Sequence, residues 1–387
     1  MLNTKRPERN RDGVEHLVFV CHSSQTAGVE RSTVALVRAA KRQKARVTVV
    51  LPKPGPILDL LNAIDGVEIQ YAKAQWWMGR EHQGWRGLAK IAHCLIQSFL
   101  WWPIIARIHP TAVCVMSTVI PAPMLGARLA GVPVVAFLSE SIQTNPNLGS
   151  VLPKSIIIKY VTGLASVTVA RSHFAAGQYG GASLIEPPDI GDPKDVPAGK
   201  PDRGGQLQRL VMLGHLSSEK GQADAVRAVG VARDQGVSLT LEFYGEASPH
   251  ELTKLNTLIE AQRLTATVRH RGVTSAPLSV LRSADLSLVC SRNEAYGRVT
   301  AESLSVGTPV IGYRAGGTAE ILAGGGGIAV EPSVAALADA LVSVARDGDL
   351  FCRIARAAEE RQQSKNGFGD ADKTIRHVMA ALISQDR

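Results

Sequence analysis

The stretch DLSLVCSRNEAYGRVTAESLSVGTPVIGY, residues 285–313, contains a complete strand–helix–strand pattern. Residues 285–290 and 308–313 are short apolar runs typical of buried strands, and a polar loop separates the first run from a helical pattern. Parallel strands need a crossover connection, which is usually a helix. The stretch therefore predicts one repeating unit of a parallel sheet that is covered by helices.

The same alternation of strands and helices runs through both halves of the chain. Helical patterns at 28–43, 219–235 and 370–385 fit this alternation. Expected strands are residues 17–21, 46–51, 112–116, 133–138 and 165–170 in the first half, and 209–214, 239–245, 266–270, 285–290 and 308–313 in the second. We therefore expect an α/β protein with two Rossmann-like, doubly wound domains.

The chain has 387 residues, which is long for a single hydrophobic core. Residues 186–206 hold five prolines and four glycines, a composition typical of a linker. We expect the chain to be organised as a flexible tail (1–15), a first domain (16–188), a linker (189–207), a second domain (208–366) and a C-terminal helical segment (367–387).

Cysteine usage and the N-terminal segment bear on the compartment. The five cysteines form no CxxC pair, and four of them stand in apolar runs. This pattern predicts buried thiols in a reducing compartment and speaks against a disulfide framework or a zinc site. The polar N-terminal residues do not have the pattern of a signal peptide. We expect a cytoplasmic protein.

Positive charge is concentrated in the first half of the chain. Residues 1–190 contain 20 Lys and Arg against 11 Asp and Glu, whereas residues 191–387 contain 23 of each. An excess of this kind is typical of a domain that meets an anionic partner. Anionic lipid, a lipid-phosphate acceptor and nucleic acid all fit, and so does a solvated basic surface with no partner.

All five tryptophans lie between residues 76 and 102. They overlap an apolar stretch, residues 85–109, which is interrupted by His93, Gln97 and Pro103 and falls short of a clean membrane span. One interpretation is a buried crossover helix. The other is a membrane-surface contact, in which tryptophans act together with nearby Arg80, Arg86, Lys90 and Arg107.

Two loops that follow expected strands carry residues suited to phosphate. Gly28 opens a helix, where free backbone N–H groups favour an anion, although a tight turn explains this glycine equally well. Lys220 stands at the start of another helix, where the helix dipole disfavours a cation. A lysine there is explained by an anion that shares the site, or else by simple exposure to solvent.

The loop of the opening stretch brings two carboxylates to one corner. Glu294 lies in the loop, and Glu302 lies eight positions later within the helix. One carboxylate can hold both hydroxyls of a ribose and a second can hold an attached sugar, while amides around Gly297 cradle the phosphates between them. A helix cap, a surface glutamate and a paired acid and base for hydrolysis are the alternatives.

The stretch from Glu294 to Leu322 resembles the signature of family 4 retaining glycosyltransferases, which have the GT-B fold of two Rossmann-like domains facing a cleft. HLSSEKG (215–221) is similar to that family's GRLxxEKG segment, and AGVERSTVALVRAA (27–40) to its GGxER helix. Residues 131–140 and 166–175 fall where acceptor-domain strands of the family are expected. The resemblance covers nearly the whole chain from about residue 17.

This resemblance implies roles for individual residues. Glu302 would bind the ribose of a nucleotide-sugar donor, Glu294 the transferred sugar and Lys220 the diphosphate, while Gly28 would let the backbone of the other domain approach. Implied catalytic residues are Glu294, Lys220 and Glu140. Implied donor-binding residues are Gly28, His215, Lys220, Glu294, Tyr296, Gly297, Arg298 and Glu302, and implied acceptor-binding residues are Ser139 and Glu140. The resemblance implies neither a metal nor a cofactor.

The chain departs from the family pattern at two positions. His215 stands where the family usually has arginine, and this predicts weaker or pH-dependent binding of the diphosphate. Ser139 and Glu140 stand where many relatives carry a histidine, and we expect either residue to contact sugar or acceptor in its place.

The leading hypothesis is a metal-independent, retaining hexosyltransferase that acts on a lipid-linked or surface-polysaccharide acceptor at the cytoplasmic membrane. The basic first domain is then the membrane-facing one, and the protein is peripheral. The second hypothesis is a non-catalytic protein of the same fold that binds a nucleotide or a partner. An NAD-dependent oxidoreductase is disfavoured because no GxGxxG follows an expected strand, and nucleic-acid binding because no basic–aromatic motif occurs.

Overall fold

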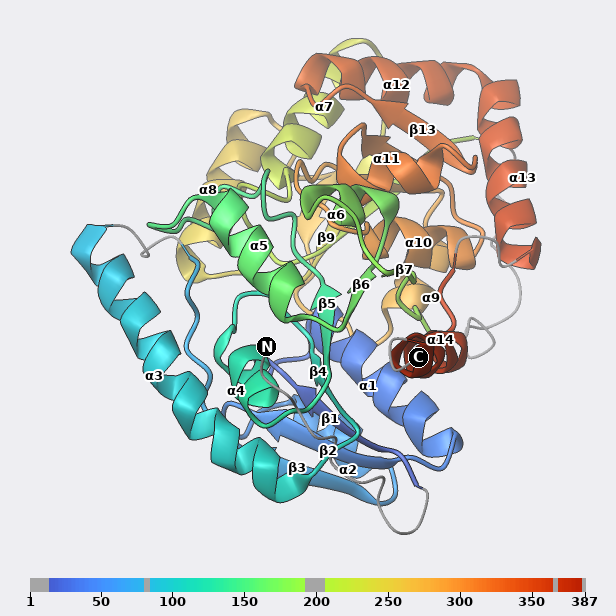
Figure 1. The fold of residues 1–387 in the computed structure, drawn as a ribbon. Helices are drawn as coiled ribbons and strands as arrows, with labels where there is room; N and C mark the ends of the chain where they lie inside the picture. Colours follow the sequence, from blue (N-terminus) through green and yellow to red (C-terminus); the bar gives the residue numbers. More distant parts are fainter. Residues whose placement is uncertain (1–13, 80–83, 192–205, 365–367, 385–387) are drawn as a thin grey trace. The chain divides into compact units, whose positions relative to one another are not determined.

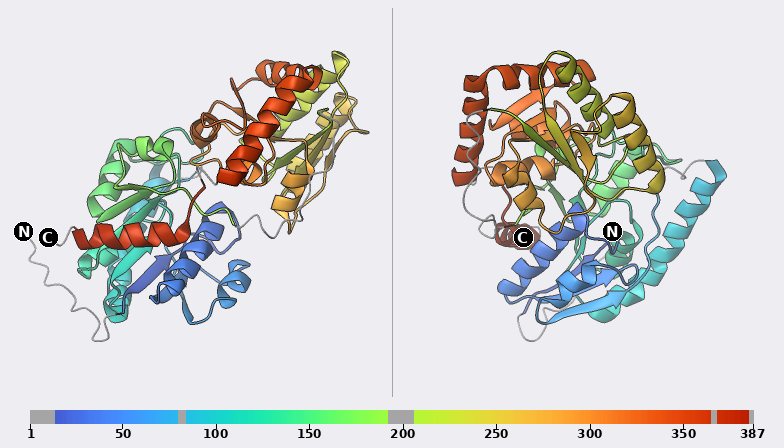
Figure 2. Two further views of the ribbon diagram at one scale, coloured as in Figure 1. Left: turned by 90° about the vertical axis from the view of Figure 1, so that its right-hand side faces the viewer. Right: turned by 180° about the vertical axis from the view of Figure 1, so that it is seen from behind.

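The computed structural model describes residues 14–79, 84–191, 206–364 and 368–384, so most of the expected tail and most of the expected linker lie outside the described residues. The chain forms two compact units. Unit 1 comprises Met1–Asp189 and Gly369–Arg387, and unit 2 comprises Ile190–Phe368. Figures 1 and 2 show that each unit is a sheet with helices packed against it.

Unit 1 is built on a seven-stranded sheet with the order β3-β2-β1-β4-β5-β6-β7, in which every pairing is parallel. Its strands are β1 (His16–Val20), β2 (Arg46–Leu51), β3 (Val67–Tyr71), β4 (Ala112–Val115), β5 (Val134–Leu138), β6 (Val167–Ala170) and β7 (Leu184–Ile185). Its helices are α1 (Gly28–Arg42), α2 (Ile57–Asn62), α3 (Gly84–Ile108), α4 (Ala122–Leu129), α5 (Lys154–Leu164), α6 (His173–Gln178) and α14 (Ala371–Ser384).

Unit 2 is built on a six-stranded sheet with the order β10-β9-β8-β11-β12-β13, also parallel throughout. Its strands are β8 (Arg209–Leu213), β9 (Thr240–Tyr244), β10 (Val268–His270), β11 (Leu286–Val289), β12 (Val310–Tyr313) and β13 (Gly327–Val330). Its helices are α7 (Gln222–Asp234), α8 (Pro249–Ala261), α9 (Pro277–Ser283), α10 (Arg298–Ser305), α11 (Gly316–Leu322), α12 (Val334–Arg346) and α13 (Gly348–Ser364). The predicted α/β class with two doubly wound sheets is confirmed.

Continuous apolar runs explain the central strands of both sheets. All residues of β1, β4, β5 and β11 are buried, because helices cover both faces of a parallel sheet. The last helix, α14, returns to unit 1 and buries Ile375 and Val378 in its core. Helices α1 and α14 lie side by side (Figure 1). Arg42 of α1 forms an ion pair of 2.5 Å with Asp372 of α14, 330 positions away.

The long helix α3 confirms one part of the expectation for residues 85–109 and corrects another. A helix does form there, but it is not buried, because only Gly87, Cys94, Ser98, Trp101 and Ile105 are shielded from solvent. These five positions make one narrow stripe, so the opposite face of the helix is left exposed. Arg80 of the predicted basic set lies outside the described residues.

Candidate functional site

The site in unit 2 follows from the strand order. β8 and β11 are neighbours in the sheet, although β9 and β10 lie between them in the chain. Connections leave such a pair in opposite directions, so a crevice opens at the carboxyl ends of the two strands. The loop after β8 carries His215 and Lys220, and the loop after β11 carries Glu294. The topology therefore brings together residues that the sequence separates.

Lys220 and Glu294 form a direct ion pair across this crevice. Lys220 Nζ donates to Glu294 Oε1 over 2.5 Å, and the side chains retain 26% and 17% of their exposure. Because both are partly open, a ligand can reach them. An ammonium has three donors, and the single contact to Glu294 is compatible with further acceptors on the same group.

His215 lies beside this pair on the loop after β8. Loss of water around the ring lowers the pKa of His215 below its ordinary value, and the Lys220 ammonium lowers that pKa further. The imidazole is therefore neutral at neutral pH in this structure. Gln222 fixes the loop from the first turn of α7 by donating to the His215 carbonyl oxygen over 3.0 Å.

Glu302 is held by its own helix. It is 6% exposed, and its Oε1 accepts a hydrogen bond of 2.7 Å from Arg298 Nε, one helical turn earlier. This pairing orients the carboxylate and balances its charge near the start of α10. Arg298 and Glu302, both predicted to bind the donor, thus form an ion pair with each other.

The loop after β11 depends on glycine for its shape. Gly297 has φ +91°, a left-handed conformation that favours glycine, and it directly precedes α10. Gly317 lies so close to the loop that a Cβ on it would stand 2.0 Å from the Tyr296 carbonyl oxygen. The Gly317 N–H donates to the Glu294 carbonyl oxygen over 2.8 Å. The Tyr296 ring packs into a hydrophobic cluster beneath.

The same loop is fixed from a second side by residues that the sequence analysis missed. Arg292 donates to Asp224 over 3.0 Å, and Asp224 also accepts a hydrogen bond of 2.9 Å from the Tyr313 hydroxyl. The Arg292 guanidinium lies 5.0 Å from the centre of the Tyr313 ring. This network ties α7, β12 and the β11 loop together, so that Glu294 is presented from a rigid support.

In unit 1, Glu140 follows β5 and turns toward the end of β4. Its carboxylate accepts hydrogen bonds from the Ser117 hydroxyl, the Thr118 backbone N–H at 3.2 Å and the Thr118 hydroxyl at 2.8 Å. Ser139 donates to the Met116 carbonyl oxygen over 3.1 Å. Ser139 and Glu140 therefore lie together at the carboxyl ends of β4 and β5. Ser117 and Thr118 are further members of this cluster.

The loop after β1 holds a second cluster of unit 1 that the sequence analysis also missed. Glu30 on α1 is 2% exposed, and its Oε1 has no hydrogen-bond partner among the described residues. His22 Nε2 lies 3.7 Å from that oxygen, and the His22 ring lies 5.5 Å from the Trp76 ring. Gly28, predicted to admit a donor, begins α1 in the same loop and is exposed.

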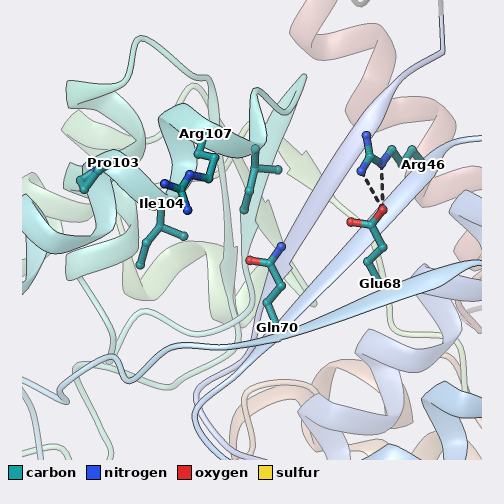
Figure 3. Close-up of a pocket in the computed structure, with 7 residues that line it drawn as sticks. Arg46, Glu68, Gln70, Pro103, Ile104 and Arg107 are labelled. Atoms are coloured by element: carbon teal, nitrogen blue, oxygen red, sulfur yellow. Dashed lines mark hydrogen bonds and ion pairs between the residues drawn. The ribbon is translucent and has the colours of Figure 1, made fainter.

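A hollow of about 530 Å³ lies at the opposite end of the unit 1 sheet, away from Ser139 and Glu140. Figure 3 shows Ile104 and Arg107 of α3 on one side of it, and Arg46, Glu68 and Gln70 of β2 and β3 on the other. Arg46 is paired with Glu68 at 2.7 Å.

Comparison with known proteins gives a family match over most of unit 2. Residues 200–361 match the family model described as glycosyl transferases group 1. The glycogen synthase of Mycobacterium tuberculosis is 29% identical over 208 residues, which are 52% of this chain and 45% of that protein. The D-inositol 3-phosphate glycosyltransferase of an Arthrobacter species is 29% identical over 197 residues, 48% of this chain and 46% of that protein. The chain thus spans about half the length of the curated relatives it matches.

Among solved structures, Anabaena HepE in complex with UDP and glucose superposes with a TM-score of 0.71 at 18% identity, covering 95% of this chain and 100% of that one. This likeness extends over both units and confirms the GT-B fold expected from the sequence. The chain therefore has the GT-B fold, and its residues 200–361 match the model of the glycosyl transferases group 1 family.

Proposed function

We propose that this protein transfers a hexose from a nucleotide-diphosphate-sugar donor to a saccharide acceptor. The observation that carries the proposal is the Lys220–Glu294 pair at the crevice between β8 and β11, within a glycosyl transferases group 1 domain. A cation and a carboxylate placed side by side suit a donor in which a charged diphosphate adjoins a neutral sugar.

Each polar residue of this site has a part in holding the proposed donor. Lys220 binds the diphosphate with donors beyond its contact to Glu294, and Glu294 accepts hydrogen bonds from hydroxyls of the transferred sugar. Glu302, oriented by Arg298, accepts from the two ribose hydroxyls. The loop at Tyr296 and Gly297 leads into the start of α10, whose first N–H groups are suited to bind the phosphates.

In the proposed reaction, the protein accelerates transfer by stabilising the diphosphate as it leaves the sugar. Its charge grows as the bond to the sugar breaks, so an ammonium and helix N-termini that are already in place lower the barrier. Lys220 supplies that charge directly, and we propose that the reaction needs no metal ion. We also propose family 4 membership and retention of configuration at the sugar, both on the resemblance of residues 294–322 to the family 4 signature.

Unit 1 supplies the acceptor side of the proposed reaction. Glu140 and Ser139 lie at the carboxyl edge of its sheet, and Glu140 is held in place by Ser117 and Thr118, which suits it to contact acceptor hydroxyls. We propose a lipid-linked or surface-polysaccharide acceptor at the cytoplasmic membrane, and a peripheral contact of the protein with that membrane. The excess of Lys and Arg in residues 1–190 supports this orientation.

The first experiment is a thermal-shift panel with UDP, GDP, ADP and dTDP on the wild type and on Glu302→Ala. A ligand at about 100 times its dissociation constant adds roughly 2.7 kcal/mol to stability. We expect UDP to stabilise the wild type, since HepE was solved with UDP, and Glu302→Ala to lose the shift. Stabilisation of both proteins by equal amounts would show that Glu302 does not bind the ribose.

The second candidate is a non-catalytic, nucleotide-binding protein of the same fold. The observation that favours it is the neutral His215, which adds no positive charge beside Lys220. Donor turnover separates the two candidates. If the wild type hydrolyses or transfers the nucleotide-sugar and Glu294→Ala does not, the non-catalytic candidate is eliminated. Nucleotide binding with no turnover would support that candidate. Activity that survives a chelator would support metal independence.

A further inference from the structure

The long helix α3 is attached to unit 1 by one narrow stripe. Its buried residues are Gly87, Cys94, Ser98, Trp101 and Ile105, at steps of three, four and seven. Helix α4 approaches this stripe closely, because a Cβ on Gly126 would stand 2.6 Å from the Cβ of Trp101. The Trp101 indole N–H also donates to the Lys73 carbonyl oxygen over 3.3 Å. The stripe fixes the rotation of the helix and so decides which face points outward.

The outward face is apolar and unusually exposed. A helix on the surface of a soluble protein normally turns charged residues to solvent. On α3 the exposed large apolar side chains are Trp85 (75%), Leu88 (60%), Leu95 (46%), Ile96 (65%), Phe99 (61%), Leu100 (61%) and Trp102 (47%). We call these seven residues the outward face. A contiguous apolar surface of this kind marks an interaction site.

Charge at the ends of α3 indicates what the partner is. The helix contains Arg86, Lys90 and Arg107 and no Asp or Glu. The Arg86 guanidinium lies 5.7 Å from the centre of the Trp85 ring, and Arg107, which lines the hollow in Figure 3, makes no ion pair among the described residues. Exposed arginines near both ends of an apolar face that carries two tryptophans suit phosphate headgroups above acyl chains.

A second copy of the chain fits this face poorly. Two α3 helices packed on each other about a two-fold axis would bring their basic residues together, and the helix has no acid to balance them. Insertion across a bilayer fits poorly as well. The helix is long and apolar enough by composition, with a mean hydropathy of 1.3 over 18 residues, but its buried stripe is packed against unit 1.

We propose that the outward face of α3 lies in the surface of an anionic phospholipid bilayer, with the exposed Arg86 and Arg107 at the headgroup phosphates. This inference rests on the membrane contact of the proposed function and names α3 as the element that makes it. The test below measures lipid binding and does not depend on sugar transfer. The helix lies along the bilayer plane, and its buried stripe stays on unit 1. Such a contact scales with buried apolar area and with attraction to anionic lipid.

The test is flotation of the purified full chain with vesicles of phosphatidylcholine alone or mixed with phosphatidylglycerol. We expect binding to the mixed vesicles that weakens as salt rises. The triple variant Ile96→Gln, Phe99→Gln and Leu100→Gln should bind about tenfold more weakly or worse, because it removes apolar area at the interface. Val273→Gln is the matched control, since Val273 is 70% exposed but lies in unit 2.

Three further measurements keep the outcomes distinct. Melting temperature and the UDP shift of the triple variant should match the wild type, which separates lost lipid binding from lost folding or lost donor binding. Brominated lipid should quench Trp85 and Trp102 in the wild type. Failure of the wild type to float, equal flotation of the triple variant, or a dimer in sedimentation that the triple variant abolishes would each overturn the proposal.

Discussion

Lys220 Nζ lies 2.5 Å from Glu294 Oε1, which joins two loops 74 positions apart in the chain at the crevice of unit 2. Removing either partner leaves the other charge uncompensated in a partly buried place. Lys220→Ala should lower kcat/KM for the nucleotide-sugar by about 10²- to 10³-fold, or roughly 3 to 4 kcal/mol, the size expected for one lost group that stabilises developing charge. Initial rates at varied donor concentration measure this.

The coupling of the two residues can be tested in the same assay. Residues that act as a unit are not additive, so Lys220→Ala combined with Glu294→Gln should cost clearly less than the sum of the two single changes. Lys254→Ala is the control, because that side chain is 61% exposed on α8. Additive losses would mean that the ion pair is incidental to the chemistry.

Most of the fold could be predicted from the sequence, and each element that was missed has an identifiable physical cause. Central strands were found because both of their faces are buried, which makes them continuous apolar runs. β3, β7 and β13 were missed, because β3 alternates polar and apolar residues, β7 has two residues, and β13 begins at the last glycine of the run 324–327, which is typical of a loop. The exposure of α3 was missed because an apolar pattern does not say which face finds a partner.

The site was predictable only where a motif names its residues. Lys220 and Glu294 were predicted on loops at strand ends and Glu302 in the helix that follows, and the strand order brings Lys220 and Glu294 into contact. The partners that hold Glu140, the Asp224–Arg292–Tyr313 network and the His22–Glu30 pair were not found. Each joins residues from different elements, and no local spacing encodes such contacts.

Gly317→Ala should destabilise unit 2 by about 1 to 3 kcal/mol or more, the usual cost of forcing extra atoms into a packed place. The added methyl group would lie 2.0 Å from the Tyr296 carbonyl oxygen, so the loop that carries Glu294 must move. Urea unfolding measures the change. Gly163→Ala is the matched control, because it lies in helix α5 with nothing within 4 Å of its Cβ position.

The two glycine substitutions should differ in sign. Alanine at position 163 should stabilise the protein by about 0.5 to 1 kcal/mol, since glycine in a helix costs that much relative to alanine. Gly317→Ala should also weaken the thermal shift by UDP, whereas Gly163→Ala should leave that shift unchanged. Equal stability of the two variants would show that the loop after β11 accommodates a side chain.

Stability should fall as the medium becomes mildly acidic, and His16 is one cause. His16 is 1% exposed, and its Nε2 lies 2.9 Å from the Thr48 hydroxyl oxygen. Burial lowers the pKa of His16, the Arg46 guanidinium lowers it further, and Glu68 acts in the opposite direction. Below the ordinary pKa of about 6.5 the unfolded chain binds a proton that the folded state does not, so stability is lost as pH falls.

Two measurements check this expectation. The free energy of unfolding in urea should be lower at about pH 5.5 than at about pH 7.5, and the difference should shrink in His16→Gln, whose amide does not titrate. Titration of the His16 ring by NMR should give a pKa below about 6.5. A measured pKa at or above that value would remove His16 as a source of the effect.

Thiol accessibility should distinguish one cysteine from the other four. Cys352 is exposed on α13, whereas Cys21, Cys94, Cys114 and Cys290 are buried. Burial raises the pKa of Cys21, Cys94 and Cys114 to about 12 and raises that of Cys290 as well, so these thiols are protonated and shielded near neutral pH.

A thiol reagent needs the thiolate and access to it. Ellman's reagent should therefore titrate one thiol per folded chain and all five in guanidinium. Cys352→Ser should abolish the rapid reaction of the folded protein, and rapid labelling of a second thiol would mean that one core opens faster than its packing implies.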